Sequence, residues 1–223
     1  TYEVFISRFN SHLANTLGNL VNRTVAMINK YFNGEIQPGN ISGEFDNDLK
    51  KTATGAIERI TEKMETLHVA DSLDEIWRVV DRANKYIDET TPWVLAKNES
   101  DRARLGTVLY NLAETIRIIA ALLSAYMPET SKRIAEQINA ADLSFESTKK
   151  FGITKAGSKV GKPEVLFARI DADKKMEELT AEFGGEEAVD ITPFKDYIEF
   201  EDFEKLDIRV GKVIECDKVP KSS

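Results

Sequence analysis

Asn19 and Arg23 carry side chains well suited to recognising a flat, hydrogen-bonding ligand. They are four residues apart, so on a helix they lie on one face. If Leu20 marks the centre of the buried stripe, both lie about 60 to 100° from it, at the rim of the core. An amide beside a guanidinium offers planar, directional hydrogen bonds that could recognise the edge of a nucleic-acid base. A polar pair on a helix surface with no ligand would give the same pattern, and both interpretations stay open.

Trp93 is the second candidate, within the segment Asp88 to Trp93. It follows Pro92 at a predicted helix break, where a ring is easily presented at the surface. An unstacked base could stack on such a ring. The alternative is a tryptophan that plugs the end of a helical bundle. Trp77, by contrast, lies on the apolar stripe of its predicted helix, which indicates packing.

The sequence has few groups that could form a catalytic or metal site. His12 and His68 are far apart and have no nearby cysteine or histidine, which argues against a zinc site of the common short spacings. Each is expected on a helix surface or as a satisfied buried residue. No GxxxxGKS or GxGxxG phosphate loop is present. We therefore expect no active site and no metal in these 223 residues.

Composition limits the class of protein. The net charge of −8 and the pI near 5.0 argue against coating nucleic acid by phosphate neutralisation, although recognition of a few unstacked bases stays possible. No apolar run reaches the roughly 18 residues that span a bilayer, and no signal-peptide pattern begins the sequence. The single cysteine, Cys216, is typical of a reducing compartment. We expect a soluble, cytoplasmic protein.

Apolar residues recur every three or four positions through the first 140 residues, which predicts long amphipathic helices. Asn33-Gly34 is a stop signal, and a Gly/Pro-rich loop follows it to about Glu44. Pro92 disfavours a helical residue at Thr91, so a helix should end there. The predicted helices cover about residues 5–31, 46–67, 72–91 and 99–126, with a short fifth helix after Pro128 that ends near Asn139.

Long helices joined by short loops predict an all-α helical bundle. Ser72 and Glu75 have the spacing of a capping box at the start of the third helix. Beyond the bundle, predicted as residues 1–143, residues 144–170 are expected to be irregular. Residues 171–197 are predicted as a short charged helix, Lys174 to Phe183, and an acidic linker. In residues 198–223, apolar and charged residues alternate as in a half-buried strand.

Four segments, in order, resemble the methionyl-tRNA synthetase family. Asn15 to Gly34 resembles the first helix of its class I anticodon-binding domain, and Asp88 to Lys97 resembles that domain's second signature. Leu166 to Ile170 resembles the segment that closes the domain. Ile198 to Pro220 resembles the opening strand of the appended OB-fold tRNA-binding domain of bacterial members. The resemblance covers nearly the whole chain.

The resemblance implies recognition of the CAU anticodon of methionine tRNA. In the family, asparagine and arginine of the first helix contact the anticodon cytosine, and the tryptophan stacks on it. These roles fall on Asn19, Arg23 and Trp93, and Pro92 and Asp88 would shape the loop.

The resemblance also implies membership of an ATP-dependent methionine–tRNA ligase. The family's HIGH and KMSKS motifs are not in this sequence, so ATP and methionine would bind elsewhere and this part is expected to be inactive alone. No cofactor is expected here. The full-length enzyme is expected to be a homodimer through the OB-fold. This part would carry only a truncated OB-fold and is expected to be a monomer. The rivals are a helical protein-interaction module without RNA specificity and the anticodon domain of a related class I synthetase.

Overall fold

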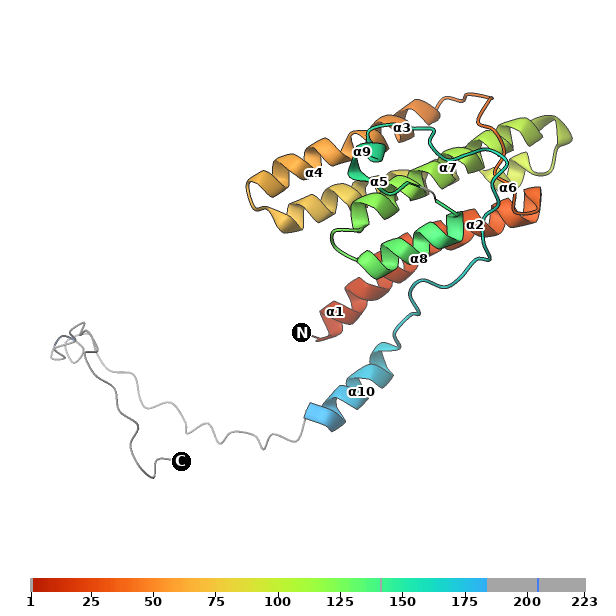
Figure 1. Cartoon of the computed structure of the whole chain (residues 1–223). Coiled ribbons are helices and arrows are strands. Elements are labelled where there is room, and N and C mark those ends of the chain that lie inside the picture. The colour runs from red at the N-terminus through yellow and green to blue at the C-terminus, as the bar shows by residue number, and fades with distance from the viewer. Residues whose placement is uncertain (1, 141, 184–203, 205–223) are drawn as a thin grey trace. The chain divides into compact units, whose positions relative to one another are not determined.

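The computed structural model describes residues 2–140, 142–183 and 204, and it forms an all-α fold over that part of the chain (Figure 1). The chain divides into two compact units, residues 1–178 and 179–223. The elements, in chain order, are α1 Tyr2–Arg8, η1 Phe9–Gly18, α2 Asn19–Phe32, α3 Asp46–Thr54, α4 Ala56–Glu65, α5 Val69–Thr90, α6 Pro92–Leu95, η2 Glu99–Asp101, α7 Arg102–Leu123, α8 Pro128–Ile138, α9 Phe145–Thr148 and α10 Ala172–Phe183.

The predicted helices and their ends are largely confirmed. Asn33 and Asn139 both end their helices in the left-handed conformation, as is common for asparagine at this position. The short charged helix predicted from Lys174 is α10. The predicted strand of residues 198–223 lies outside the described residues apart from Glu204.

Helix α7 is the centre of the bundle. It contacts α2, α3, α5, α6, α8 and α9, and Figure 1 shows it running between them. The segment 99–123 is long and apolar enough to cross a membrane, but 94% of its most apolar window is buried against other elements. Its apolarity on all sides is that of a buried core helix.

The first three predicted helices each differ in one detail from the structure. The first predicted helix contains a π-helical stretch, η1, in which the Thr16 hydroxyl donates to the Ser11 carbonyl five residues earlier. The second is divided at Gly55 into α3 and α4. The capping-box prediction is wrong, because α5 already begins at Val69 and Ser72 is buried inside it. The Ser72 hydroxyl is instead 2.6 Å from the hydroxyl of Tyr126.

Glu114 and Arg117 hold the irregular segment that follows the bundle. Their side chains are 0% and 1% exposed and are paired at 2.8 Å on α7. Glu114 accepts hydrogen bonds from the backbone N–H groups of residues 152–154. Arg117 donates to backbone carbonyls within residues 142–150. We call this the Glu114–Arg117 clamp, and its contacts tie residues 142–154 to the core helix.

The charge state of the clamp follows from its contacts. Burial by itself would raise the pKa of Glu114. Hydrogen bonds from Arg117 and Thr154 outweigh the burial, so the pKa of this carboxyl lies below its usual value. The Glu114 side chain is therefore a carboxylate at neutral pH.

Candidate nucleic-acid interface

The structure brings the two candidate clusters together. The Arg23 guanidinium lies over the Trp93 ring, with Cζ 5.9 Å from the ring centre. Arg23 belongs to α2 and Trp93 to α6, so this contact joins segments that are far apart in the sequence. A guanidinium over an indole face is a favourable cation–π arrangement. We call Asn19, Arg23 and Trp93 the candidate face.

Both polar residues of the candidate face are exposed on α2. Asn19 is the first residue of that helix, and Arg23 follows one turn later. Leu20 and Thr24, between and beside them, are buried against the core. The helix therefore presents an amide and a guanidinium to solvent from a backbone that its apolar side holds in place.

Trp93 is presented by the corner between α5 and α6. Trp93 is 41% exposed, so much of this residue lies at the surface. Pro92 and Thr90 are the buried residues at this corner, and the Thr90 hydroxyl donates to the Tyr86 carbonyl at 2.6 Å. Thr91 between them has φ 40° and ψ 61°, which is left-handed. The exposed indole therefore directly follows a backbone segment that two buried residues hold in place.

Asp88 is exposed on the last turn of α5. Within the described residues, no hydrogen bond or ion pair connects it to the candidate face. Its neighbour Glu89 is paired with Arg82 at 2.9 Å, and Arg82 also pairs with Asp48. The position of Asp88 is therefore set by α5, and the ion pairs at Arg82 fix that helix end to α3.

A polar network around Asp46 on α3 joins α5, which leads into the corner, to α7. Arg104 donates two hydrogen bonds to this carboxylate, at 2.7 and 2.6 Å, and the Tyr86 hydroxyl donates a third at 2.7 Å. Burial alone would raise the pKa of Asp46, but these hydrogen bonds outweigh it and lower the pKa. Burial and the neighbouring Asp46 raise the pKa of Tyr86, which stays protonated and able to donate.

Asn84 is a positioning residue that the sequence-based predictions missed. Its amide nitrogen donates to the Thr16 carbonyl at 3.3 Å and to the Val80 carbonyl at 3.1 Å. The backbone N–H of Asn19 donates to the same Thr16 carbonyl. Asn84 on α5 therefore holds the turn from which the Asn19 side chain projects. In the sequence it is one more polar residue of an amphipathic helix, with no signal to single it out.

The contacts of the two histidines are with residues outside the candidate face. His12 is exposed and its ring centre is 6.4 Å from that of Trp77, while exposed His68 is 2.7 Å from the Thr66 hydroxyl. Trp77 is partly buried and packs against the core. Among the described residues, no group of three or more His, Cys, Asp or Glu side chains could hold a metal ion.

The chain is similar to known proteins over most of its length. The family model described as the anticodon binding domain of methionyl tRNA ligase matches residues 36–188. The methionine–tRNA ligase of Clostridium acetobutylicum is 51% identical over 99% of this chain and 34% of that protein. The ligase of Clostridium tetani is 52% identical over 97% of this chain and 34% of its own length. The chain thus spans about a third of the length of these relatives.

Solved structures of a methionyl-tRNA synthetase are also similar to this chain. The free form of Mycobacterium tuberculosis methionyl-tRNA synthetase matches with a TM-score of 0.72 and 32% identity, over 77% of this chain and 35% of that one. The same synthetase with methionyl-adenylate matches with a TM-score of 0.70 and 33% identity, over 75% of this chain and 33% of that chain. The family match includes Trp93 and lies C-terminal to Asn19 and Arg23, which the longer alignments cover. The chain belongs to the family of the anticodon-binding domain of methionyl tRNA ligase.

Proposed function

We propose that this chain recognises the CAU anticodon of methionine tRNA as part of a longer methionine–tRNA ligase. The observation that carries the proposal is the Arg23–Trp93 contact, which unites an amide, a guanidinium and a half-exposed indole on one face. Asn19 and Arg23 would hydrogen-bond the edge of the first anticodon base, and Trp93 would stack on its ring. Pro92 and Asp88 would shape the corner that carries the indole.

The chemistry of this face suits an unstacked base in a loop. Amide and guanidinium groups donate in fixed planes, so they distinguish base edges, whereas an aromatic ring stacks on any base. Single-stranded loops are the usual targets of sequence-specific RNA recognition. A domain with an acidic overall balance can therefore be specific for RNA, because the specificity does not depend on neutralising many phosphates.

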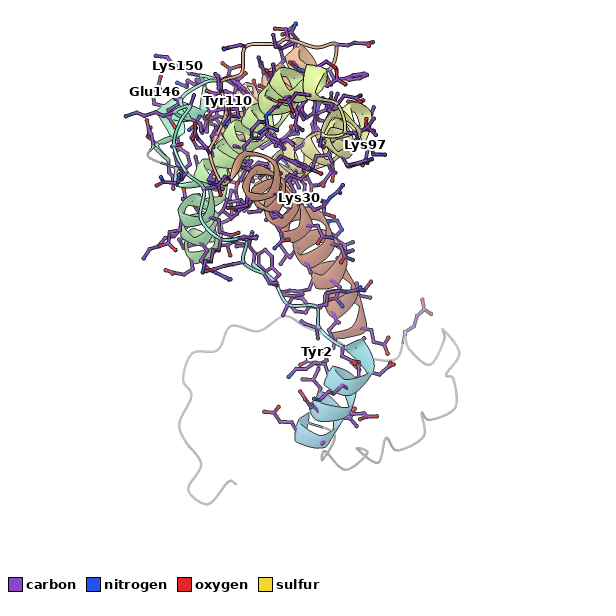
Figure 2. All side chains as sticks on the ribbon, turned by 90° about the vertical axis from the view of Figure 1, so that its right-hand side faces the viewer. Tyr2, Lys30, Lys97, Tyr110, Glu146 and Lys150 are labelled. Atoms are coloured by element: carbon purple, nitrogen blue, oxygen red, sulfur yellow. The ribbon has the colours of Figure 1, made fainter. Side chains whose placement is uncertain are left out.

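Two lysines near the candidate face would contact the RNA backbone. Lys30 is seven residues after Arg23 on α2, which is about 10 Å along the helix and about 20° around it. Lys97 lies two residues after the end of α6. Figure 2 looks onto the end of the bundle where α2 ends and α6 lies, and it shows both lysines there. Both are exposed, so each can neutralise a phosphate without losing a buried contact.

The remaining parts of the proposed enzyme lie outside the elements described above. Methionine and ATP would bind the catalytic part of the longer ligase, which would also be this domain's partner in the chain, and no cofactor would bind the bundle. Residues 198–223 would begin an OB-fold through which the full-length enzyme dimerises. The enzyme would act in the cytoplasm, where tRNA is charged.

The test is a titration with RNA hairpins, followed by tryptophan fluorescence at fixed salt. One hairpin carries the CAU anticodon loop and the other differs only in the first anticodon base. The CAU loop should quench fluorescence at lower RNA concentration than the changed loop. Arg23→Ala should abolish that preference. Arg78→Ala should keep it, because Arg78 is an exposed arginine on α5 outside the candidate face.

Two results would contradict the proposal. Equal affinity for both loops would favour a protein-interaction module or the domain of another synthetase. A preference that survives Arg23→Ala would show that other residues recognise the base. Repeating the titration with the full-length ligase separates weak binding by this part alone from a wrong assignment.

A further inference from the structure

Thr91 has a backbone conformation that is unfavourable for its residue type. At φ 40° and ψ 61° it lies in the left-handed region, where a β-branched side chain is a genuine outlier. It also precedes Pro92, whose ring restricts the preceding residue further. A strained residue persists only where its surroundings hold it, and such residues cluster at functional sites.

The contacts of Thr91 explain what holds it. Its N–H donates to the Ile87 carbonyl at 2.9 Å, which closes the last turn of α5. Its carbonyl accepts from the N–H groups of Val94 at 2.8 Å and Leu95 at 3.3 Å, which opens α6. One residue therefore belongs to the hydrogen bonding of two helices. With Thr90 and Pro92 buried on either side, the chain direction at this corner has little freedom.

Within the described part of the chain, three other residues that are not glycine have a left-handed backbone, and each has a simpler explanation. Asn33 and Asn139 are helix C-caps of a residue type that tolerates this region. Leu67, with φ 59°, lies in the turn between α4 and α5 and is 85% exposed. Thr91 alone among these four lies two residues before an indole that contacts a residue from another helix.

We propose that Thr91 is a positioning residue for Trp93. Its left-handed conformation turns the chain from α5 into α6 so that the indole lies under the Arg23 guanidinium before any RNA binds. Its role in RNA binding rests on the proposed function, whereas its control of Trp93 in the free protein does not. Because the indole is already in place, binding loses little side-chain freedom, which raises affinity.

The test replaces Thr91 by glycine, which adopts the left-handed region without strain but leaves it as easily. All variants carry Trp77→Phe, so that Trp93 is the only tryptophan. Thr91→Gly should leave the thermal midpoint unchanged or raised, since strain is removed. It should also increase the nanosecond motion of Trp93, measured by fluorescence anisotropy decay in the free protein. Affinity for the CAU hairpin should fall about three- to tenfold.

Two further variants make the result specific. Leu67→Gly changes another left-handed residue far from α6 in the sequence, and it should alter neither Trp93 motion nor RNA affinity. Thr91→Asn keeps a side chain that restricts the backbone yet tolerates this region, so it should behave like the parent. Unchanged Trp93 motion in Thr91→Gly, or an equal change in Leu67→Gly, would overturn the proposal. If neither this chain nor the full-length ligase binds either hairpin, the proposed function fails, while the anisotropy of the free protein still decides the role of Thr91.

Discussion

The Glu114–Arg117 clamp and the candidate face are built from the same kinds of planar polar groups but differ in exposure. In the clamp, both side chains are buried, and their hydrogen bonds go to each other, to backbone groups and to the hydroxyls of Ser147 and Thr154. On the candidate face, Asn19 and Arg23 are exposed, and Trp93 is 41% exposed.

This difference in exposure implies that the clamp and the candidate face serve different purposes, stability and recognition. A buried ionic group whose partner is removed is left without compensation, so the clamp should dominate stability. An exposed amide or guanidinium exchanges water for a ligand at little cost to the fold, so the candidate face should dominate binding. Substitutions in the two regions should therefore give opposite patterns of lost stability and lost RNA affinity.

The largest expected effect is on stability, in Glu114→Gln. The neutral amide leaves Arg117 buried beside no carboxylate and puts an N–H group among donors, which should cost roughly 3–5 kcal/mol. Urea unfolding followed by circular dichroism measures the loss. Glu146→Gln is the matched control, because its pair with Lys149 is on the surface and should matter little. A similar loss of stability in both variants would contradict the dominant role of the clamp in stability.

Low pH should lower the stability of the protein, because it protonates two buried carboxyls. The folded pKa values of Glu114 and Asp46 lie below their ordinary values of 4.5 and 3.8. A lowered folded pKa gives stability that is present above the ordinary value and is lost as pH falls through the folded value. The urea midpoint should therefore hold from pH 7 to about pH 5 and then fall below about pH 4. If Glu114→Gln showed an unchanged acid dependence, Glu114 would not contribute to it.

On the candidate face, Trp93→Ala should give the opposite pattern. Loss of one stacking surface should weaken binding of the CAU hairpin by about 1–3 kcal/mol. Stability should change by less than about 1 kcal/mol, because the side chain is half exposed. Trp77→Ala is the contrast, since that ring packs on the core and its loss should lower stability without removing base preference. A Trp93→Ala protein that unfolds like Trp77→Ala would show that the indole is structural.

Asn84→Ala should give the smallest effects, and they should appear in both stability and RNA affinity. Losing its hydrogen bond to the Thr16 carbonyl should cost about 0.5–1.5 kcal/mol of stability. RNA affinity should fall a few-fold, because the turn that carries Asn19 is less firmly held. Asn47→Ala, at an exposed position of α3, serves as the control in both measurements. An Asn84→Ala protein with lower stability but parental base preference would limit Asn84 to a packing role.

Local features of the sequence determined the elements and several of their ends. Apolar spacing predicts the helices because each amphipathic helix must bury one face, whatever its partner. The stops at Asn33, Pro92 and Asn139 follow from the backbone preferences of single residues and their neighbours. The packed state of Trp77 also follows from its place on an apolar stripe. These predictions succeed because the interactions responsible act within a few residues.

Only the tertiary structure decided how those elements combine into a site. The Arg23–Trp93 contact depends on how α2 and α6 pack, and no local pattern in either segment encodes the other. Glu114 and Arg117 have the spacing of a surface ion pair, and their burial becomes visible only when α7 is the core helix. Ser72 has the sequence of a helix cap, yet it is buried inside α5 beside Tyr126, because packing with a distant segment outweighs a local capping preference.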